Sequence, residues 1–181
     1  MSDLRVVVPD DDLLMRSGVV AVVGLVEGAS VVAEAGSLSE LLAAVATHRP
    51  DVVVTDVRMP PTFTDEGVQA TRSIRDDWPS TGVVVLSQHA EPEHVLTVFE
   101  AGNDGIAYLL KENVADMATL ENSIRAVATG GSSVDPAVIS ILVESRTRRS
   151  TGIDGLTPRE TEAQGSEEIR PAGWCRSRAG I

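Results

Sequence analysis

The chain has 181 residues and a formal net charge of −12 at pH 7. This length predicts one domain of common size, followed by a tail or by a small second domain. The charge is uneven, because residues 1–143 carry 8 basic and 21 acidic side chains, whereas residues 144–181 carry 7 and 6. The acidic part should repel phosphate backbones, so it is a poor nucleic-acid binder by itself.

The compartment is predicted from the single cysteine and the apolar runs. Cys175 has no partner for an internal disulfide, which is typical of a reducing cytoplasm. The N-terminus, Met1-Ser2-Asp3, lacks the basic region of a secretory signal. The longest apolar run, Gly18–Val26, is too short to cross a bilayer. We therefore expect a soluble cytoplasmic protein that does not bind membranes.

Short apolar runs alternate with helical segments along most of the chain. The expected strands are residues 4–8, 31–35, 51–56, 83–87 and 106–110. The expected helices are residues 13–26, 37–48, a segment after the Pro-rich loop that ends near 77, 92–101 and 115–128. A short helix from Asp135-Pro136 to about Val143 and a linker from Glu144 to Gly155 should follow.

The pattern of the strands predicts the fold class. Five strands alternate with five helices, and the strands are continuous apolar runs rather than alternating ones. Both features indicate a parallel sheet with helices on both faces. We expect a doubly wound five-stranded sheet of the flavodoxin-like type, with strand order 2-1-3-4-5. Asp12 should cap the first helix, and Ser37–Glu40 has the spacing of a capping box.

Acidic side chains follow two of the expected strands, at the edge where such sheets bind ligands. The first strand ends in Asp10 and Asp11, and the third ends in Asp56. In the order 2-1-3-4-5 these two strands are neighbours, so the three carboxylates would converge and raise one another's pKa. Magnesium relieves such repulsion, because it takes oxygen ligands and keeps several waters.

The same edge carries groups that suit phosphoryl transfer. A carboxylate such as Asp56 can attack phosphorus to give an acyl phosphate, and the transfer depends mainly on positioning and charge neutralisation. Lys111, the single lysine beside 14 arginines, follows the fifth strand, and Ser87 ends the fourth. Each feature alone is usually a solvated turn or a structural residue. The four together, each at its own strand end, favour a site.

Four segments resemble the motifs of response-regulator receiver domains of the NarL/LuxR type. They are Val6–Asp11, Asp51–Pro60, Val83–Ser87 and Ala107–Lys111, and the resemblance covers residues 4 to about 143. It implies a two-component signalling protein that is phosphorylated by a sensor histidine kinase. It also implies that two copies pair on phosphorylation. The protein would not be an enzyme beyond slow self-dephosphorylation.

The resemblance also gives each matched residue a role at the site. Asp56 would be the phosphoacceptor. Asp10 and Asp11 would bind Mg²⁺ together with Asp56 and the backbone carbonyl of Arg58.

The remaining matched residues would contact the phosphoryl group or respond to it. Lys111 and Ser87 would contact it, and Ser87 and Tyr108 would form the switch. In that switch Ser87 moves inward and Tyr108 turns in behind it, which changes the surface around the fourth helix and fifth strand. Pro9 stands where the family commonly has a small apolar residue, and its missing N–H could displace the strand end beside Asp10.

The last segment, Leu156–Glu160, resembles the opening of a LuxR-type DNA-binding helix-turn-helix. The next stretch, Thr161–Glu168, has one small apolar residue and a glycine, which does not suit an amphipathic helix. The 26 residues from Leu156 to Ile181 are also fewer than the roughly 60 that four helices and their turns need. We expect a receiver domain at 1–130, a short helix and linker at 131–155, and an incomplete, disordered remnant at 156–181. DNA is then a partner only if a complete helix-turn-helix exists.

Two other functions are consistent with parts of the sequence. Phosphatases of the haloacid-dehalogenase type also use an Asp nucleophile and magnesium. They need a second Asp two residues after the first, where this chain has Arg58. A receiver-like module that binds partners without being phosphorylated is the third interpretation, and Pro9 favours it.

Overall fold

The computed structural model describes residues 3–100, 102–114 and 116–153. Contacts within the chain divide it into two compact units, residues 1–144 and 145–181. The first unit contains the whole sheet. The predictions made for residues 156–181, including the incomplete helix-turn-helix, lie outside the described residues.

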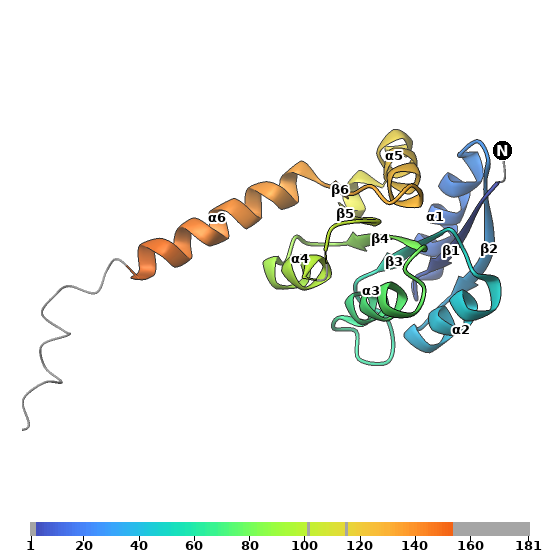
Figure 1. The fold of residues 1–181 in the computed structure, drawn as a ribbon, viewed down its shortest axis with the longest axis horizontal. Helices are drawn as coiled ribbons and strands as arrows, with labels where there is room; N and C mark the ends of the chain where they lie inside the picture. The colour runs from blue at the N-terminus through green and yellow to red at the C-terminus, as the bar shows by residue number, and fades with distance from the viewer. Residues whose placement is uncertain (1–2, 101, 115, 154–181) are drawn as a thin grey trace, which may run out of the picture. The chain divides into compact units, whose positions relative to one another are not determined.

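A parallel sheet with helices on both faces forms the first unit (Figure 1). Its strand order is β2-β1-β3-β4-β5-β6, which confirms the order predicted for the first five strands. The sixth strand was not predicted. The strands are β1 (Leu4–Pro9), β2 (Ala29–Ala35), β3 (Val52–Asp56), β4 (Gly82–Ser87), β5 (Ile106–Leu110) and β6 (Ser133–Val134).

The helices follow the strands in alternation, as predicted. They are α1 (Leu13–Leu25), α2 (Leu38–His48), α3 (Glu66–Asp77), α4 (Pro92–Phe99), a 3-10 turn at Lys111–Asn113, α5 (Met117–Ala128) and α6 (Pro136–Ile153). The last helix corrects one prediction. It continues to Ile153 instead of ending near Val143, so residues 144–153 are helical and not a linker. Among the described residues, no helix combines the length and the apolar character needed to span a lipid bilayer.

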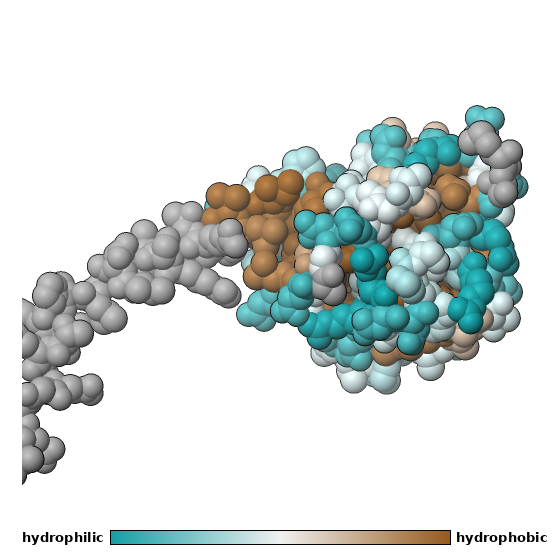
Figure 2. Space-filling view, in the orientation of Figure 1, coloured by the Kyte–Doolittle hydropathy of each residue, from teal (hydrophilic) through white to brown (hydrophobic). Residues whose placement is uncertain are grey.

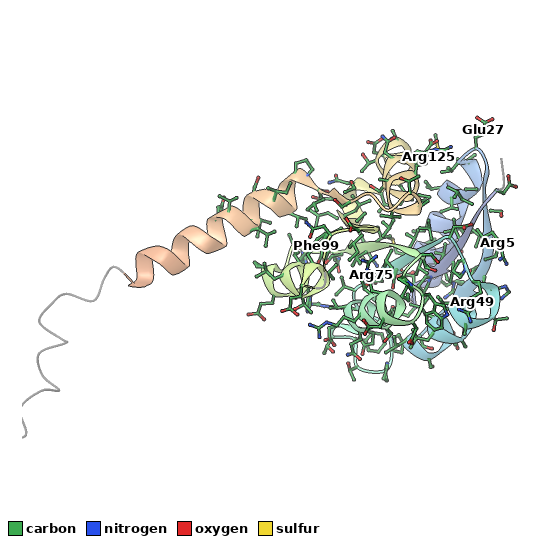
Figure 3. All side chains as sticks on the ribbon, viewed as in Figure 1. Arg5, Glu27, Arg49, Arg75, Phe99 and Arg125 are labelled. Carbon is green, nitrogen blue, oxygen red and sulfur yellow. The ribbon has the colours of Figure 1, made fainter. Side chains whose placement is uncertain are left out.

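Two apolar clusters, one on each face of the sheet, explain why the strands are continuous apolar runs. Val53 of β3 packs in one cluster with α2, α3 and α4, whereas its neighbours Val52 and Val54 pack in the other with α1 and α5. Several charged side chains, among them Arg125 and Glu27, lie at the periphery (Figure 3). There, a guanidinium nitrogen of Arg125 in α5 donates to the carbonyl of Glu27, 2.8 Å away, and so ties α5 to the turn before β2.

Two helix starts have the caps that the sequence predicts. Asp12 accepts hydrogen bonds from the backbone N–H groups of Leu14 and Met15. Ser37 accepts one from the N–H of Glu40, and the Glu40 carboxylate accepts one from the N–H of Gly36 at 2.7 Å. These bonds fix the ends of the βα turns.

Apolar side chains are exposed at the start of α6, where Figure 2 shows a hydrophobic area. In α6, Ile139 is 49 % exposed and Val143 is 60 % exposed, whereas Val138 is fully buried in the apolar core. The first two turns of α6 therefore pack on the sheet with one side and leave apolar surface on another.

Gly67 allows α3 to pack directly on the end of β3. A Cβ at this position would lie 1.9 Å from the carbonyl oxygen of Asp56. Gly67→Ala should therefore push α3 away from β3 and lower the free energy of unfolding by about 3 kcal/mol, as measured by urea titration. Gly18→Ala in α1 is the matched control, because nothing lies within 4 Å of its Cβ position. This control should be stabilised by roughly 0.5–1 kcal/mol, and equal stability of the two variants would contradict the packing argument.

Candidate functional site

Three carboxylates meet at the carboxyl ends of β1 and β3, as the sequence predicts. One oxygen from each of Asp10, Asp11 and Asp56 lies within 4.8 Å of the others. Asp10 is 2 % exposed and Asp56 is 8 % exposed, whereas Asp11 is exposed. The cluster is therefore buried on the side of the sheet and open to solvent beside Asp11.

Pro9 does not displace the end of β1. It is the last residue of the strand and pairs with Ala35 of β2, and the N–H of Asp10 donates to the Ala35 carbonyl at 3.0 Å. The irregularity in this pairing falls earlier, between Val6 and Val7. The strand geometry that carries Asp10 thus continues through the proline.

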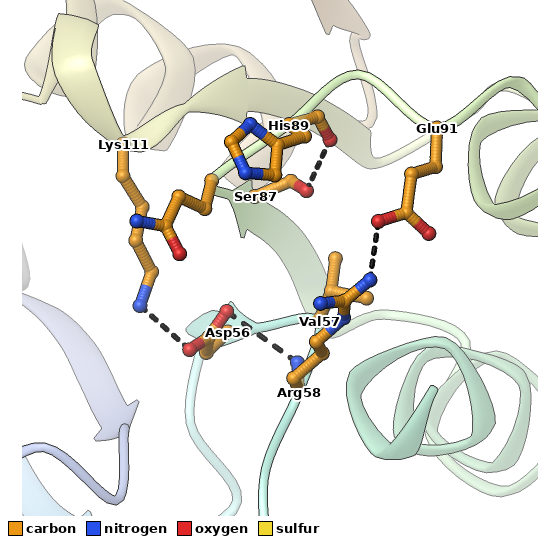
Figure 4. A pocket seen from close by; sticks show the side chains of 8 residues that line it. Asp56, Val57, Arg58, Ser87, His89, Glu91 and Lys111 are labelled. Atoms are coloured by element: carbon orange, nitrogen blue, oxygen red, sulfur yellow. Dashed lines mark hydrogen bonds and ion pairs between the residues drawn. The ribbon is translucent and has the colours of Figure 1, made fainter. Parts of the chain in front are cut away.

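Lys111 links the two buried carboxylates. Its Nζ donates to Asp56 Oδ2 at 2.6 Å and to Asp10 Oδ2 at 3.1 Å (Figure 4 shows the bond to Asp56). The lysine stands directly after β5, so the sheet brings together three segments that are far apart in the chain. One ammonium group thereby offsets part of the negative charge of three acids.

The pKa values of Asp56 and Lys111 are shifted by burial and by the charges around these two residues. Burial raises the pKa of Asp56, and the negative charge of Asp10 raises it further. The hydrogen bond and the charge of Lys111 lower it, but not enough to offset burial, so the pKa of Asp56 is raised overall. Burial lowers the pKa of Lys111, but the bond to Asp56 and the charges of Asp56 and Asp10 outweigh it and raise the pKa. Lys111 is therefore a permanent cation at neutral pH.

Ser87 and Tyr108 lie behind the acids on adjacent strands. Ser87 is 5 % exposed, and its hydroxyl donates to the carbonyl of His89 at 2.6 Å. Tyr108 is fully buried, and burial raises its pKa. Its hydroxyl forms no hydrogen bond of normal geometry among the described residues, although the Ser87 hydroxyl is near enough to oppose part of the rise in its pKa. The Tyr108 side chain therefore lies inside the protein while the Ser87 hydroxyl bonds His89, and the switch role of these two residues stays a prediction.

A small hollow of about 60 Å³ opens beside Asp56 (Figure 4). Its lining residues are Asp56, Val57, Arg58, Ser87, Gln88, His89, Glu91 and Lys111. A carboxylate, a hydroxyl and an ammonium group therefore face one space at the strand ends. That space has the composition expected around a small anion bound to Asp56.

The Arg58 side chain was not assigned a role from the sequence, which singled out its backbone carbonyl alone. Its guanidinium Nη2 forms an ion pair with Oε1 of Glu91, the residue before α4. Its backbone N–H lies 3.4 Å from Asp56 Oδ1. Sequence reasoning missed Glu91 because no local pattern indicates that two loops so far apart in the chain meet.

Glu66 is a second residue that sequence reasoning missed. It is 1 % exposed, lies in the first turn of α3, and accepts hydrogen bonds from the N–H groups of Thr62 at 2.8 Å and Thr64 at 3.0 Å. Burial alone would raise its pKa, but bonds from the Thr62 hydroxyl and from backbone N–H groups lower it to about 2. Glu66 thereby fixes the loop that carries Arg58. In the same loop, the backbone of Phe63 is left-handed, with φ of 58°.

The comparison with known families shows which family this fold belongs to. The model of the response regulator receiver domain matches residues 6–125. The chain belongs to this family. The match confirms the resemblance to receiver domains and the doubly wound parallel fold predicted from the sequence, which is the CheY-like fold.

Curated relatives of this receiver domain are regulatory proteins. DegU of Brevibacillus brevis is 33% identical over 145 residues, which are 80% of this chain and 58% of DegU. NreC of Staphylococcus epidermidis is 30% identical over 147 residues, which are 81% of this chain and 65% of NreC. NarL of Mycobacterium tuberculosis is 32% identical over 88% of this chain and 71% of NarL. The chain therefore spans less than two thirds of the length of the first two.

Solved structures agree with the receiver fold. A LuxR-family response regulator from Aurantimonas sp. SI85-9A1 has a TM-score of 0.68 at 28% identity, covering 81% of this chain and 99% of that one. The signal receiver domain of NarL from Mycobacterium tuberculosis has a TM-score of 0.63 at 32% identity, with 72% and 99% covered.

The low pKa of Glu66 predicts how the stability of the receiver depends on pH. Because the folded-state pKa of about 2 lies below the ordinary value of 4.5, ionised Glu66 stabilises the fold above pH 4.5. That contribution should be lost as the pH falls from 4.5 toward 2. Urea titrations of the wild type and of Glu66→Gln should show a free-energy difference that is constant at neutral pH and shrinks in acid.

Glu93→Gln is the matched control, since Glu93 occupies the first turn of α4 but is exposed. Its difference from the wild type should depend less on pH. If the difference caused by Glu66→Gln were the same above and below pH 4.5, the loop would not depend on an ionised Glu66.

Proposed function

We propose that the chain is a phosphorylation switch in which Asp56 accepts a phosphoryl group from a sensor histidine kinase. The observation that carries the proposal is the contact of Lys111 Nζ with Asp56 and Asp10, beside a cluster of three carboxylates. Membership of the receiver family supports it and favours it over the haloacid-dehalogenase type of phosphatase. The kinase is the partner that this family implies.

The reaction needs one bond to form and one to break. A carboxylate oxygen of Asp56 attacks the phosphorus of the donor's phosphohistidine while the P–N bond breaks. The imidazole nitrogen keeps the electron pair of that bond, and an acyl phosphate remains on Asp56. Lys111 favours the ionised, nucleophilic form of Asp56, which burial alone would disfavour. Lys111 then offsets the charge of the phosphoryl oxygens.

A magnesium ion fits the cluster in front of Asp56. Asp10, Asp11 and Asp56 would hold it, because three carboxylate oxygens within 4.8 Å of one another suit this ion. The backbone carbonyl of Arg58, two residues after Asp56, would be the fourth protein ligand that the family resemblance implies. The exposed side at Asp11 leaves room for the waters that magnesium retains. When bound, the ion supplies further neutralisation of the charge on the phosphoryl group.

Ser87 would transmit the modification. Its hydroxyl now donates to the His89 carbonyl, and a phosphoryl oxygen in the adjacent hollow is a stronger, charged acceptor. Rotation of Ser87 toward that oxygen would alter the surroundings of Tyr108 and the surface of α4 and β5. We propose that partner binding changes there, including the pairing of two copies of the chain. The NarL and DegU relatives are named as transcriptional regulatory proteins. We therefore also propose that the signal leads to DNA binding, which would require residues beyond α6.

The third interpretation, an unphosphorylated binding module, was based on Pro9. Because β1 continues through Pro9 and Asp10 lies in the cluster, that residue no longer favours it.

The direct test is incubation with acetyl phosphate and magnesium, followed by intact-mass measurement. The wild type should gain the mass of one phosphoryl group, and Asp56→Ala should gain none. Asp51→Asn is the matched control, because Asp51 immediately precedes the same strand at its opposite end and is exposed. This control should be labelled like the wild type. An unlabelled wild type, or labelling that persists in Asp56→Ala, would overturn the proposal.

A further inference from the structure

The ion pair between Arg58 and Glu91 closes one side of the hollow beside Asp56. Arg58 comes from the loop after β3, and Glu91 immediately precedes α4 (Figure 4). The second carboxylate oxygen of Glu91 lies 3.1 Å from Nδ1 of His94, one turn into α4. The pair therefore tethers the first turn of α4 to the loop that follows Asp56.

A second tether holds the same turn between β4 and α4. The hydroxyl of Ser87 donates to the carbonyl of His89 at 2.6 Å, and the N–H of Glu91 donates to that same carbonyl at 3.0 Å. Ser87 and Arg58 thus both hold the segment 88–91, one from each side. Both also line the hollow beside Asp56.

Phosphorylation would place a new acceptor in the hollow that both tethering residues line. An acyl phosphate on Asp56 adds about one to two negative charges to this hollow. The cationic side chains that line the hollow are Lys111, already bonded to Asp56, and Arg58, bonded to Glu91. Glu91 is the one lining carboxylate besides Asp56 itself. A phosphoryl group and Glu91 are therefore alternative partners for one guanidinium.

We propose that the Arg58 guanidinium is a further phosphoryl-contacting group, which Glu91 holds in the unphosphorylated protein and releases on phosphorylation. The inference rests on the proposed function of Asp56. The transfer of Arg58, together with the rotation of Ser87, removes both tethers from segment 88–91. The first turn of α4 then becomes the part of the surface that differs between the two states.

The relative strength of the two bonds favours this exchange. The side chains of Arg58 and Glu91 are 51% and 37% exposed, and ion pairs with such exposure contribute little to stability. A guanidinium matches the oxygens of a phosphoryl group with two parallel hydrogen bonds, which are among the stronger hydrogen bonds in proteins. The existing pair is therefore weak enough to be replaced.

The test uses beryllofluoride with magnesium, a stable mimic of the acyl phosphate, on the full chain. In Glu91→Gln the competitor of the mimic is removed, so its apparent affinity should rise about two- to fivefold. In Arg58→Gln a contact to the mimic is lost, so the affinity should fall about tenfold, although the backbone carbonyl of Arg58 remains. Opposite changes are the signature of competition, since breaking a merely structural ion pair would move both variants in the same direction.

Amide hydrogen exchange of segment 88–95 gives the second readout. In the wild type, beryllofluoride should speed exchange in this segment. In both variants exchange without beryllofluoride should already be a few fold faster than in the wild type, because the Arg58–Glu91 tether is broken while the bond of Ser87 to His89 remains. Glu100→Gln is the matched control. Glu100 pairs with Arg72 at the other end of α4, away from the hollow, with side chains 62% and 54% exposed. This control should match the wild type in both affinity and exchange.

Several outcomes would overturn the inference. They are affinities that change in the same direction or not at all, and a wild-type segment 88–95 that does not respond to beryllofluoride. Acetyl phosphate labelling separates this failure from failure of the proposed function. If the wild type is labelled on Asp56 but the two variants behave alike, only the role of Arg58 is refuted. If the wild type is not labelled, both proposals are refuted.

Discussion

The contact between the Lys111 ammonium and the carboxylates of Asp56 and Asp10 is the interaction on which the site depends. It joins residues that are 55 and 101 positions apart in the chain. They meet because the strand order places β1 and β3 side by side, with β5 two strands further along. Without a cation at this point, three carboxylates within 4.8 Å of one another would repel one another.

The site is therefore held together by charges that are only partly balanced, which is typical of functional sites. Asp56 has a raised pKa in spite of its bond to Lys111, and the buried hydroxyl of Tyr108 forms no hydrogen bond of normal geometry among the described residues. The surrounding valine-rich sheet supplies the stability that allows these groups to persist, because its two apolar clusters cover both faces.

The sequence predicts what depends on strand ends and local caps. The acids at Asp10 and Asp56 and the lysine at position 111 could be placed, because parallel strands bring their carboxyl ends to one edge. Glu66 and Glu91 could not, since their partners depend on how two loops fold back in space. The strand β6 has two residues, too few for a pattern. Helix α6 was expected to end early because its second half is polar, yet arginine is a good helix former and no proline interrupts it.

The central claim is that Asp10, Asp11 and Asp56 form one divalent cation site. Isothermal titration with magnesium tests it most directly, and Asp11→Asn is the informative variant because Asp11 is exposed and its replacement leaves the core intact. The account predicts one ion bound per chain in the wild type and markedly weaker binding in Asp11→Asn. A wild type that binds no magnesium, or binding that is unchanged in Asp11→Asn, would contradict it.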